Sequence, residues 1–222
     1  MIKAVIFDVD GTLVDSVGFH AQAWVKALKE YGFEFSHEQL RQQIGKGGEY
    51  ILEELLSSED AEKLGEDISS YRKEFYQENL LSQIKPFAQV KELFKQLKAD
   101  GLKIVLASSA RKDTLKHYVQ MLEVEDLIEG ATSTNDVEKA KPEPDIFIAA
   151  LDKLKGVDAK EVVVVGDSPY DAQAASKIPI TTVGVLGGGF SEEVLKEAGC
   201  IAIYQDPADL LKNYKDSPLY PS

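Results

Sequence analysis

The sequence lacks the features that would place a protein in a membrane or an oxidising compartment. It has one cysteine, Cys200, which excludes an internal disulfide and is predicted to be a buried structural thiol. No segment approaches about 18 consecutive apolar residues, the length that a membrane-spanning helix needs. The apolar run at the N-terminus is interrupted at Asp8, so it does not match a secretory signal peptide. We therefore expect a cytoplasmic protein that does not associate with a membrane.

Basic residues are also scarce. The chain has 25 Lys and Arg against 38 Asp and Glu, which gives a formal net charge of −13. This charge repels polyanions and argues against nucleic acid or an anionic membrane as a partner. Because the acids are spread along helix-like stretches such as residues 53–66, we attribute them to solubility. A small-molecule partner fits better, and the sequence leaves a monomer and a homodimer equally open.

Apolar runs of strand length recur along the 222 residues and are separated by stretches of helical period. They cover residues 2–7, 104–107, 162–165, 180–185 and 201–204. This alternation predicts an α/β fold, a Rossmann-like parallel sheet flanked by helices. One helix is expected to begin near Pro86 and to end at Gly101, and others are expected after Lys112, Pro144, Ser168 and Ser191.

Residues 16–84 break this alternation. They carry three helical patterns and no convincing strand. We predict a helical cap of residues 16–85, inserted after the first strand into an α/β core formed by residues 1–15 and 86–222. The two crossings between these parts would make a natural hinge.

The first apolar run leads directly into Asp8-Val9-Asp10-Gly11-Thr12. Residues two apart in a strand share a side, so Asp8 and Asp10 would point the same way before the chain turns at Gly11. Two carboxylates about 5 Å apart repel by roughly 3 kcal/mol at an effective dielectric of about 20. A stable pair therefore predicts a cation, and carboxylate oxygens suit Mg²⁺. A solvated Asp-Gly turn would explain the same residues without a metal.

Polar groups also follow the other predicted strands. Ser108 and Ser109 follow residues 104–107, Asp167 and Asp171 follow residues 162–165, and Lys141 lies between these two segments. Ligands of an open parallel sheet bind beyond the carboxyl ends of its strands, so these side chains are expected to converge there.

In order and spacing, these four segments resemble the four motifs of the haloacid dehalogenase superfamily of phosphotransferases. The helical insertion is similar to the cap of the phosphoglycolate phosphatase and β-phosphoglucomutase branch. The resemblance implies a phosphatase of small phosphomonoesters. Asp8 would be the nucleophile that forms an aspartyl-phosphate, and Asp10 would give a proton to the leaving oxygen and later take one from water.

The resemblance also implies roles for the remaining motif residues. Mg²⁺ would bind the Asp8 carboxylate, the Asp10 backbone carbonyl and Asp167. Asp171 would complete the metal site by positioning Lys141 or a metal-bound water. Ser108 and Lys141 would hold the phosphoryl oxygens.

Substrate contacts outside the motifs are expected from Thr12, Ser109, His20 and Lys46. His20 shares a helix face with Trp24, so it serves either the hinge packing or the chemistry. Lys46 lies among glycines that fit either an anion site or a flexible turn. No arginine occupies the cap position that relatives use to grip a second phosphate. Gly187-Gly188-Gly189 is predicted to be a mobile linker rather than a binding loop.

Three other functions remain open. A phosphomutase would use the same phosphoaspartate but needs a cap that holds a second phosphate. A dehalogenase needs no metal, so Asp10 and Asp167 argue against it. A non-catalytic metal or phosphate binding module is disfavoured because all the chemical positions are intact.

Overall fold

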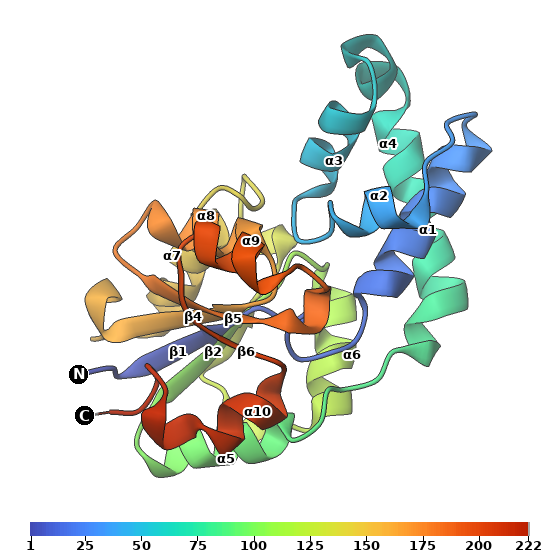
Figure 1. Cartoon of the computed structure of the whole chain (residues 1–222). Helices are drawn as coiled ribbons and strands as arrows, with labels where there is room; N and C mark the ends of the chain where they lie inside the picture. The colour runs from blue at the N-terminus through green and yellow to red at the C-terminus, as the bar shows by residue number, and fades with distance from the viewer. Residues whose placement is uncertain (222) are drawn as a thin grey trace.

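The computed structural model describes residues 1–221 and has an α/β fold built on one six-stranded sheet (Figure 1). All strand pairs are parallel and the order is β3-β2-β1-β4-β5-β6. The strands are β1 (Ala4–Phe7), β2 (Lys103–Ala107), β3 (Gly130–Thr132), β4 (Val162–Gly166), β5 (Thr181–Val185) and β6 (Cys200–Tyr204). The predicted parallel sheet is therefore confirmed.

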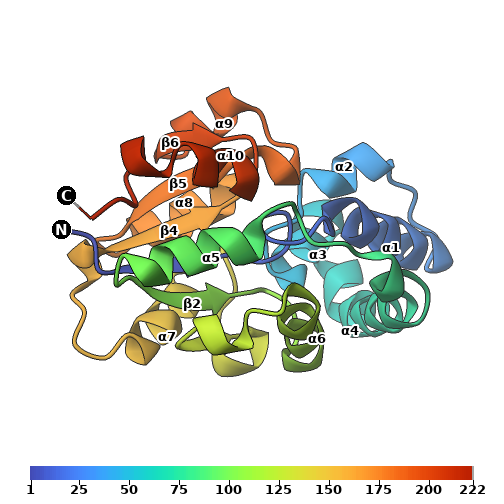
Figure 2. The ribbon, with the colours of Figure 1, turned by 90° about the horizontal axis from the view of Figure 1, so that it is seen from below.

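Helices cover both faces of the sheet, which is why its central strands are almost wholly apolar. On one face, Val5 and Phe7 of β1 pack with α5 (Val90–Ala99), α6 (Lys112–Leu122) and α10 (Pro207–Lys212), and Figure 2 shows α5 and α10 in front of the strands. On the other face, Ala4 and Ile6 pack with α7 (Asp145–Lys153) and α8 (Pro169–Ser176). A short helix, α9 (Glu192–Glu197), covers the edge of β5 and β6.

Two sequence predictions about these elements differ from the structure. The three-residue strand β3 was missed because Gly130-Ala131-Thr132 is too short and too small to make an apolar run. Helix α5 begins at Val90 rather than near Pro86. Pro86 instead pairs with Val14 in an isolated antiparallel bridge, and Gln89 has a left-handed φ of 61°, so the helix cannot start before it.

The segment after β1 is helical, with α1 (Val17–Glu30), α2 (His37–Arg41), α3 (Gly48–Leu55) and α4 (Ser58–Phe75), then a π-helical turn (Tyr76–Leu80) and a 3₁₀ turn (Leu81–Gln83). In Figure 1 these helices stand together at one end of the sheet, away from the chain termini. They have a core of their own, centred on Trp24, Leu28 and Ile68. The two connections lie side by side, since Asp15 N donates to Lys85 O at 2.9 Å and Phe87 N donates to Leu13 O at 2.9 Å.

The division into a core of residues 1–15 and 86–222 and a cap of residues 16–85 stays a prediction. Two smaller points can be compared directly. Cys200 is buried at the start of β6, as predicted. Within residues 1–221, no helix combines the length and the apolar character that crossing a membrane demands.

Candidate active site

The carboxyl ends of β1 and β4, which are neighbours in the sheet, bring three buried carboxylates together. Asp8 follows β1, Asp167 follows β4, and Asp171 lies in the first turn of α8. Each of them has an oxygen within 4.8 Å of the others. The parallel sheet makes this convergence, because adjacent strands end at the same edge.

Lys141 lies at the centre of this cluster and is 1% exposed. Its Nζ donates to Asp8 Oδ1 at 2.6 Å and to Asp171 Oδ1 at 2.8 Å. The other oxygen of Asp171 accepts hydrogen bonds from the backbone N and the Oγ of Ser168, at 3.1 and 2.6 Å. Both oxygens of Asp171 are thus used within the protein, which fixes Lys141 beside Asp8.

One ammonium group does not balance three buried carboxylates. Burial raises the pKa of Asp8 to about 7, and burial together with the charges of Asp8 and Asp171 holds the pKa of Asp167 well above its usual value. Burial alone would lower the pKa of Lys141, but the charges of Asp171 and Asp8 outweigh it and raise that pKa. The excess of negative charge makes this cluster a candidate site for a cation.

Two carboxylate oxygens of the cluster make few hydrogen bonds. Within residues 1–221, the one hydrogen bond that Asp8 Oδ2 accepts comes from Thr12 Oγ1, at 3.5 Å. Asp167 Oδ1 accepts from Thr12 Oγ1 at 2.8 Å, and Asp167 Oδ2 accepts no hydrogen bond from residues 1–221. The donor set that the structure offers is therefore two carboxylate oxygens, a set suited to Mg²⁺ or a similar hard cation.

Glycines pack closely around Asp167. A Cβ added to Gly188 or to Gly11 would overlap the Asp167 carboxylate, and one added to Gly187 would overlap the backbone oxygen of Gly11. The segment that carries Gly187 and Gly188 forms a 3₁₀ turn, Leu186–Gly188. The sequence favoured a mobile linker here, and in the structure Gly187 and Gly188 allow close approach to the Gly11 backbone and to the Asp167 carboxylate.

Asp10 has hydrogen-bond partners different from those of the carboxylate cluster. Its Oδ1 accepts from Ser16 Oγ at 2.6 Å and lies 2.8 Å from His20 Nε2, and its Oδ2 accepts from Ser108 Oγ at 3.2 Å. Burial would raise the pKa of Asp10, but the nearby His20 and the hydrogen bonds from His20 and Ser16 lower it to about 2. In this arrangement Asp10 is a carboxylate anion that has no proton to give.

His20 is placed for both of the roles left open by its sequence position. Its ring stacks on Tyr76, with centroids 4.1 Å apart. Its Nδ1 lies 3.4 Å from Nη1 of Arg72. Because a guanidinium can only donate, Nδ1 accepts, so Nε2 carries the proton that is donated to Asp10. His20 therefore links α4 to Asp10 as well as packing at the base of the cap.

The other predicted contact residues lie in different surroundings. Thr12 and Ser108 are fully buried beneath the carboxylates, and neither lines the cavity. Ser109 and Lys46 do line it. The Lys46 ammonium is engaged, however, since it contacts the Glu54 carboxylate, donates to Gln43 Oε1 at 2.6 Å and lies 4.9 Å from the Tyr170 ring centroid.

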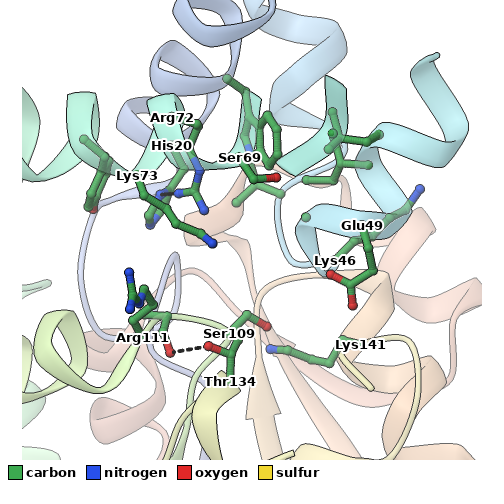
Figure 3. Close-up of a pocket in the computed structure, with 18 of the residues that line it drawn as sticks. His20, Lys46, Glu49, Ser69, Arg72, Lys73, Ser109, Arg111, Thr134 and Lys141 are labelled. Atoms are coloured by element: carbon green, nitrogen blue, oxygen red, sulfur yellow. Dashed lines mark hydrogen bonds between the residues drawn. The ribbon is translucent and has the colours of Figure 1, made fainter. Parts of the chain in front are cut away.

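A cavity of about 1050 Å³ lies between the helices α1, α3 and α4 and the end of the sheet (Figure 3). Asp8, Asp10 and Lys141 lie at its floor. Sequence reasoning missed several polar residues of its walls, namely Glu49, Ser69, Arg72, Lys73, Arg111 and Thr134. The sequence indicated no arginine at the cap position that relatives use to grip a second phosphate, but α4 places Arg72 in the cavity wall. A helical period was available to find it, because residues 65, 69 and 72 form one face of α4 that lines the cavity.

Arg72 and Lys73 differ from the other basic side chains of the site. Burial lowers the pKa of Arg72, whose guanidinium lies 5.1 Å from the Trp24 ring. Burial and the nearby charges of Arg72 and Arg111 lower the pKa of Lys73. Within residues 1–221, neither of them nor Arg111 forms an ion pair with a carboxylate.

Comparison with known proteins places this site in a family. Residues 5–185 match the family described as "Haloacid dehalogenase-like hydrolase". The chain is 30% identical to a phosphoglycolate phosphatase of Yersinia pestis over 95% of its length and 92% of that protein. It is 29% identical to the pyrophosphatase PpaX of Bacillus velezensis over 83% of each chain.

A solved structure agrees with these matches. The crystal structure of a hydrolase from Pseudomonas syringae superimposes with a TM-score of 0.83 at 32% identity, over 96% of this chain and 98% of that one. The match spans both the sheet and the inserted helices. The chain therefore belongs to the haloacid dehalogenase-like hydrolases, and it is an enzyme of that family.

Proposed function

We propose that this enzyme is a Mg²⁺-dependent phosphatase of small phosphomonoesters that works through an aspartyl-phosphate on Asp8. The observation that carries the proposal is the state of Asp8 at the cavity floor. One of its oxygens is held by Lys141 at 2.6 Å, and the other accepts, within residues 1–221, only a long hydrogen bond of 3.5 Å from the Thr12 hydroxyl. A carboxylate that is fixed on one side and available on the other is suited to nucleophilic attack. The names of the phosphatase relatives support the same reaction class.

In the first step the Asp8 carboxylate attacks phosphorus, the Asp8–phosphorus bond forms and the ester oxygen leaves. Lys141 neutralises charge on the phosphoryl oxygens, and the Ser108 hydroxyl assists once it leaves Asp10. Asp10 gives a proton to the leaving oxygen. Because His20 and Ser16 hold Asp10 as an anion with a pKa of about 2, Asp10 must first exchange these partners and take up a proton from solvent, which it then donates in this step.

In the second step a water attacks the same phosphorus, and the bond between phosphorus and Asp8 breaks. Asp10, now a carboxylate, takes the proton of that water, which returns both aspartates to their starting states. Asp171 does not react, since Lys141 and Ser168 occupy its oxygens. It is a positioning residue for Lys141.

The metal would be held by the carboxylates of Asp8 and Asp167 and, as the family resemblance implies, by the backbone carbonyl of Asp10. When bound, Mg²⁺ supplies positive charge to the phosphoryl oxygens. The fit rests on the excess negative charge of the buried cluster, in which Asp8, Asp167 and Asp171 each have an oxygen within 4.8 Å of the others.

A phosphate-release screen tests this function. Purified enzyme is assayed on a panel of small phosphomonoesters with Mg²⁺, with a chelator, and as the Asp8→Asn variant. We expect release with Mg²⁺ that disappears on chelation and in the variant. Full turnover after chelation would contradict the metal site, and near-normal turnover of the variant would contradict the nucleophile.

A phosphomutase is the second candidate, and the structure provides one specific observation in its favour. Arg72, Lys73 and Arg111 could anchor a phosphate that is not reacting. We still expect hydrolysis, because the two named relatives are hydrolases and a mutase must exclude water. An assay with β-glucose 1-phosphate, primed with a bisphosphate, distinguishes the phosphatase from the phosphomutase. Isomerisation faster than phosphate release from every ester in the panel would establish the mutase.

The partner in this proposal is a small phosphate ester. A cytoplasmic location and a monomer or homodimer remain expectations from the sequence. A non-catalytic binding module would bind phosphate or metal without turnover, and the same screen would reveal it.

A further inference from the structure

Three basic side chains meet at one side of the cavity, and we call them the basic cluster: Arg72, Lys73 and Arg111. Arg72 and Lys73 come from α4, and Arg111 directly precedes α6. Figure 3 shows Arg72 and Lys73 reaching down from the cap wall and Arg111 reaching up from the opposite wall. Two walls of the cavity thus present cations to the same space.

No carboxylate within residues 1–221 lies at ion-pair distance from the basic cluster, although Glu49 and Glu66 line the same cavity and their charges partly oppose the lowering of the Lys73 pKa. The other lysines of the cavity are neutralised, Lys46 by Glu54 and Lys141 by Asp8 and Asp171. No member of the basic cluster forms such a pair within residues 1–221, and Nε of Arg72 is buried without a hydrogen-bond partner there. In a chain with 38 acids and 25 bases, three neighbouring cations without a carboxylate partner are unexpected. Like charges repel, so their proximity indicates a ligand that brings negative charge.

The contacts of Arg72 show which part of a substrate would reach this cluster. Arg72 contacts His20, and His20 contacts Asp10. In the proposed mechanism Asp10 serves the leaving oxygen, so the leaving group lies on the Asp10 side of the phosphorus. In Figure 3, Lys141 lies beyond Ser109 and away from Arg72 and Arg111. A substrate with its phosphoryl group at Asp8 and Lys141 would therefore extend its leaving group towards the basic cluster.

We propose that the basic cluster is a subsite for a second anionic group on the leaving group, a carboxylate or a phosphate. The enzyme accordingly selects short esters that carry negative charge at both ends over neutral alcohol or sugar phosphates. This selection rests on the proposed function and names its substrate class. Arg72 also orients His20, whereas Lys73 and Arg111 contribute through charge.

A matched pair of substrates isolates the second charge. 2-Phosphoglycolate and 2-hydroxyethyl phosphate have the same length and differ in a carboxylate against a hydroxymethyl group. Inorganic pyrophosphate serves as a third substrate, in which the second group is a phosphate. For each, kcat/KM is measured for the wild type, Lys73→Met and Arg111→Met. The controls are Lys63→Met on the same helix and Lys112→Met beside Arg111, two exposed lysines that do not line the cavity.

We expect the wild type to prefer at least one substrate with a second anionic group over 2-hydroxyethyl phosphate by about tenfold or more, as charge-assisted hydrogen bonds would give. Lys73→Met and Arg111→Met should each lower this preference by about tenfold, mainly through KM, while both controls keep it. The preference should also fall with added salt, because Arg111 is exposed to solvent. The substrate, 2-phosphoglycolate or pyrophosphate, whose kcat/KM falls more in the two variants identifies the natural second group.

The proposal is overturned if the wild type hydrolyses both members of the pair equally, or if the two variants behave like their controls. Circular dichroism and thermal unfolding of each variant establish that it is folded. If the wild type hydrolyses no ester at all, the proposed phosphatase function fails instead. The two failures are thus distinguishable.

Discussion

Replacing Lys141 by methionine removes the one positive charge from the buried carboxylate cluster. Lys141 and Asp171 are each 1% exposed, and Asp8 is 4% exposed. The lysine contacts both aspartates within 2.8 Å. Removing one partner of a buried ion pair costs about 3–5 kcal/mol, because the remaining charge is left unpaired in a low-dielectric interior. We expect Lys141→Met to lower the free energy of unfolding by this amount at pH 8.

The loss of unfolding free energy in Lys141→Met should depend on pH in a defined direction. A carboxyl whose folded-state pKa lies above its unfolded value binds more protons when folded, so stability falls as pH rises between the two values. The pKa of Asp8 is already raised to about 7, and loss of the ammonium raises it further. At pH 5.5 the variant can relieve its excess charge by protonation, so its deficit relative to the wild type should be smaller than at pH 8.

Urea unfolding in the presence of a chelator measures the free energy of unfolding at pH 8 and at pH 5.5. Lys177→Met is the matched control, because Lys177 contacts Glu143 at 2.8 Å but the two side chains are 41% and 35% exposed. An exposed pair of this kind contributes about 1 kcal/mol or less. Equal losses for Lys141→Met and Lys177→Met, or a larger deficit at pH 5.5 than at pH 8, would refute the reasoning.

Three further outcomes follow from the same site. Metal-free wild type should lose stability as pH rises from about 4 towards 7, because the pKa of Asp8 is raised in the folded state. Mg²⁺ should raise Tm more at pH 8 than at pH 5.5, because it binds the ionised carboxylate. An equal effect of Mg²⁺ on Tm at both pH values would contradict the metal site. Gly188→Ala should abolish the Mg²⁺ effect on Tm because its Cβ overlaps the Asp167 carboxylate, whereas Gly18→Ala, which meets no atom within 4 Å, should keep it. His20→Ala should raise the pKa of Asp10 above about 2, which ¹³C NMR of that carboxyl detects; an unchanged value would show that His20 does not set it.

The sheet was predictable from the sequence because its strands are continuous apolar runs such as Val162-Val163-Val164-Val165, and a parallel strand buried on both faces needs that pattern. The edge strand β3 has small residues and only three positions, so it left no such pattern. Pro86 was a reasonable helix start, but tertiary pairing with Val14 holds it in an extended connection.

The candidate site was likewise predictable from the sequence only in part. Asp8 and Asp167 could be expected near each other because both directly follow strands whose order the fold class suggests. The pairing of Lys141 with Asp171 and the partners of Asp10 depend on side-chain contacts across the fold, which spacing does not reveal. Lys46 was considered as an anion-binding residue because it lies among glycines, yet the Glu54 carboxylate pairs with its ammonium group. Arg72 was not identified because Lys73 and Glu74 follow it, and a run of charged residues is typical of the solvated face of a helix.

The central claim is that Asp8 becomes phosphorylated during turnover. Rapid acid quenching of the wild-type enzyme with Mg²⁺ and a substrate from the panel, followed by borohydride reduction and peptide mass spectrometry, tests it directly. Borohydride reduces an acyl-phosphate to an alcohol, so we predict homoserine at position 8 in quenched enzyme, none at Asp10 or Asp167, and none in enzyme quenched without substrate. Steady phosphate release with unmodified Asp8 at every quench time, or reduction at another aspartate, would contradict the account.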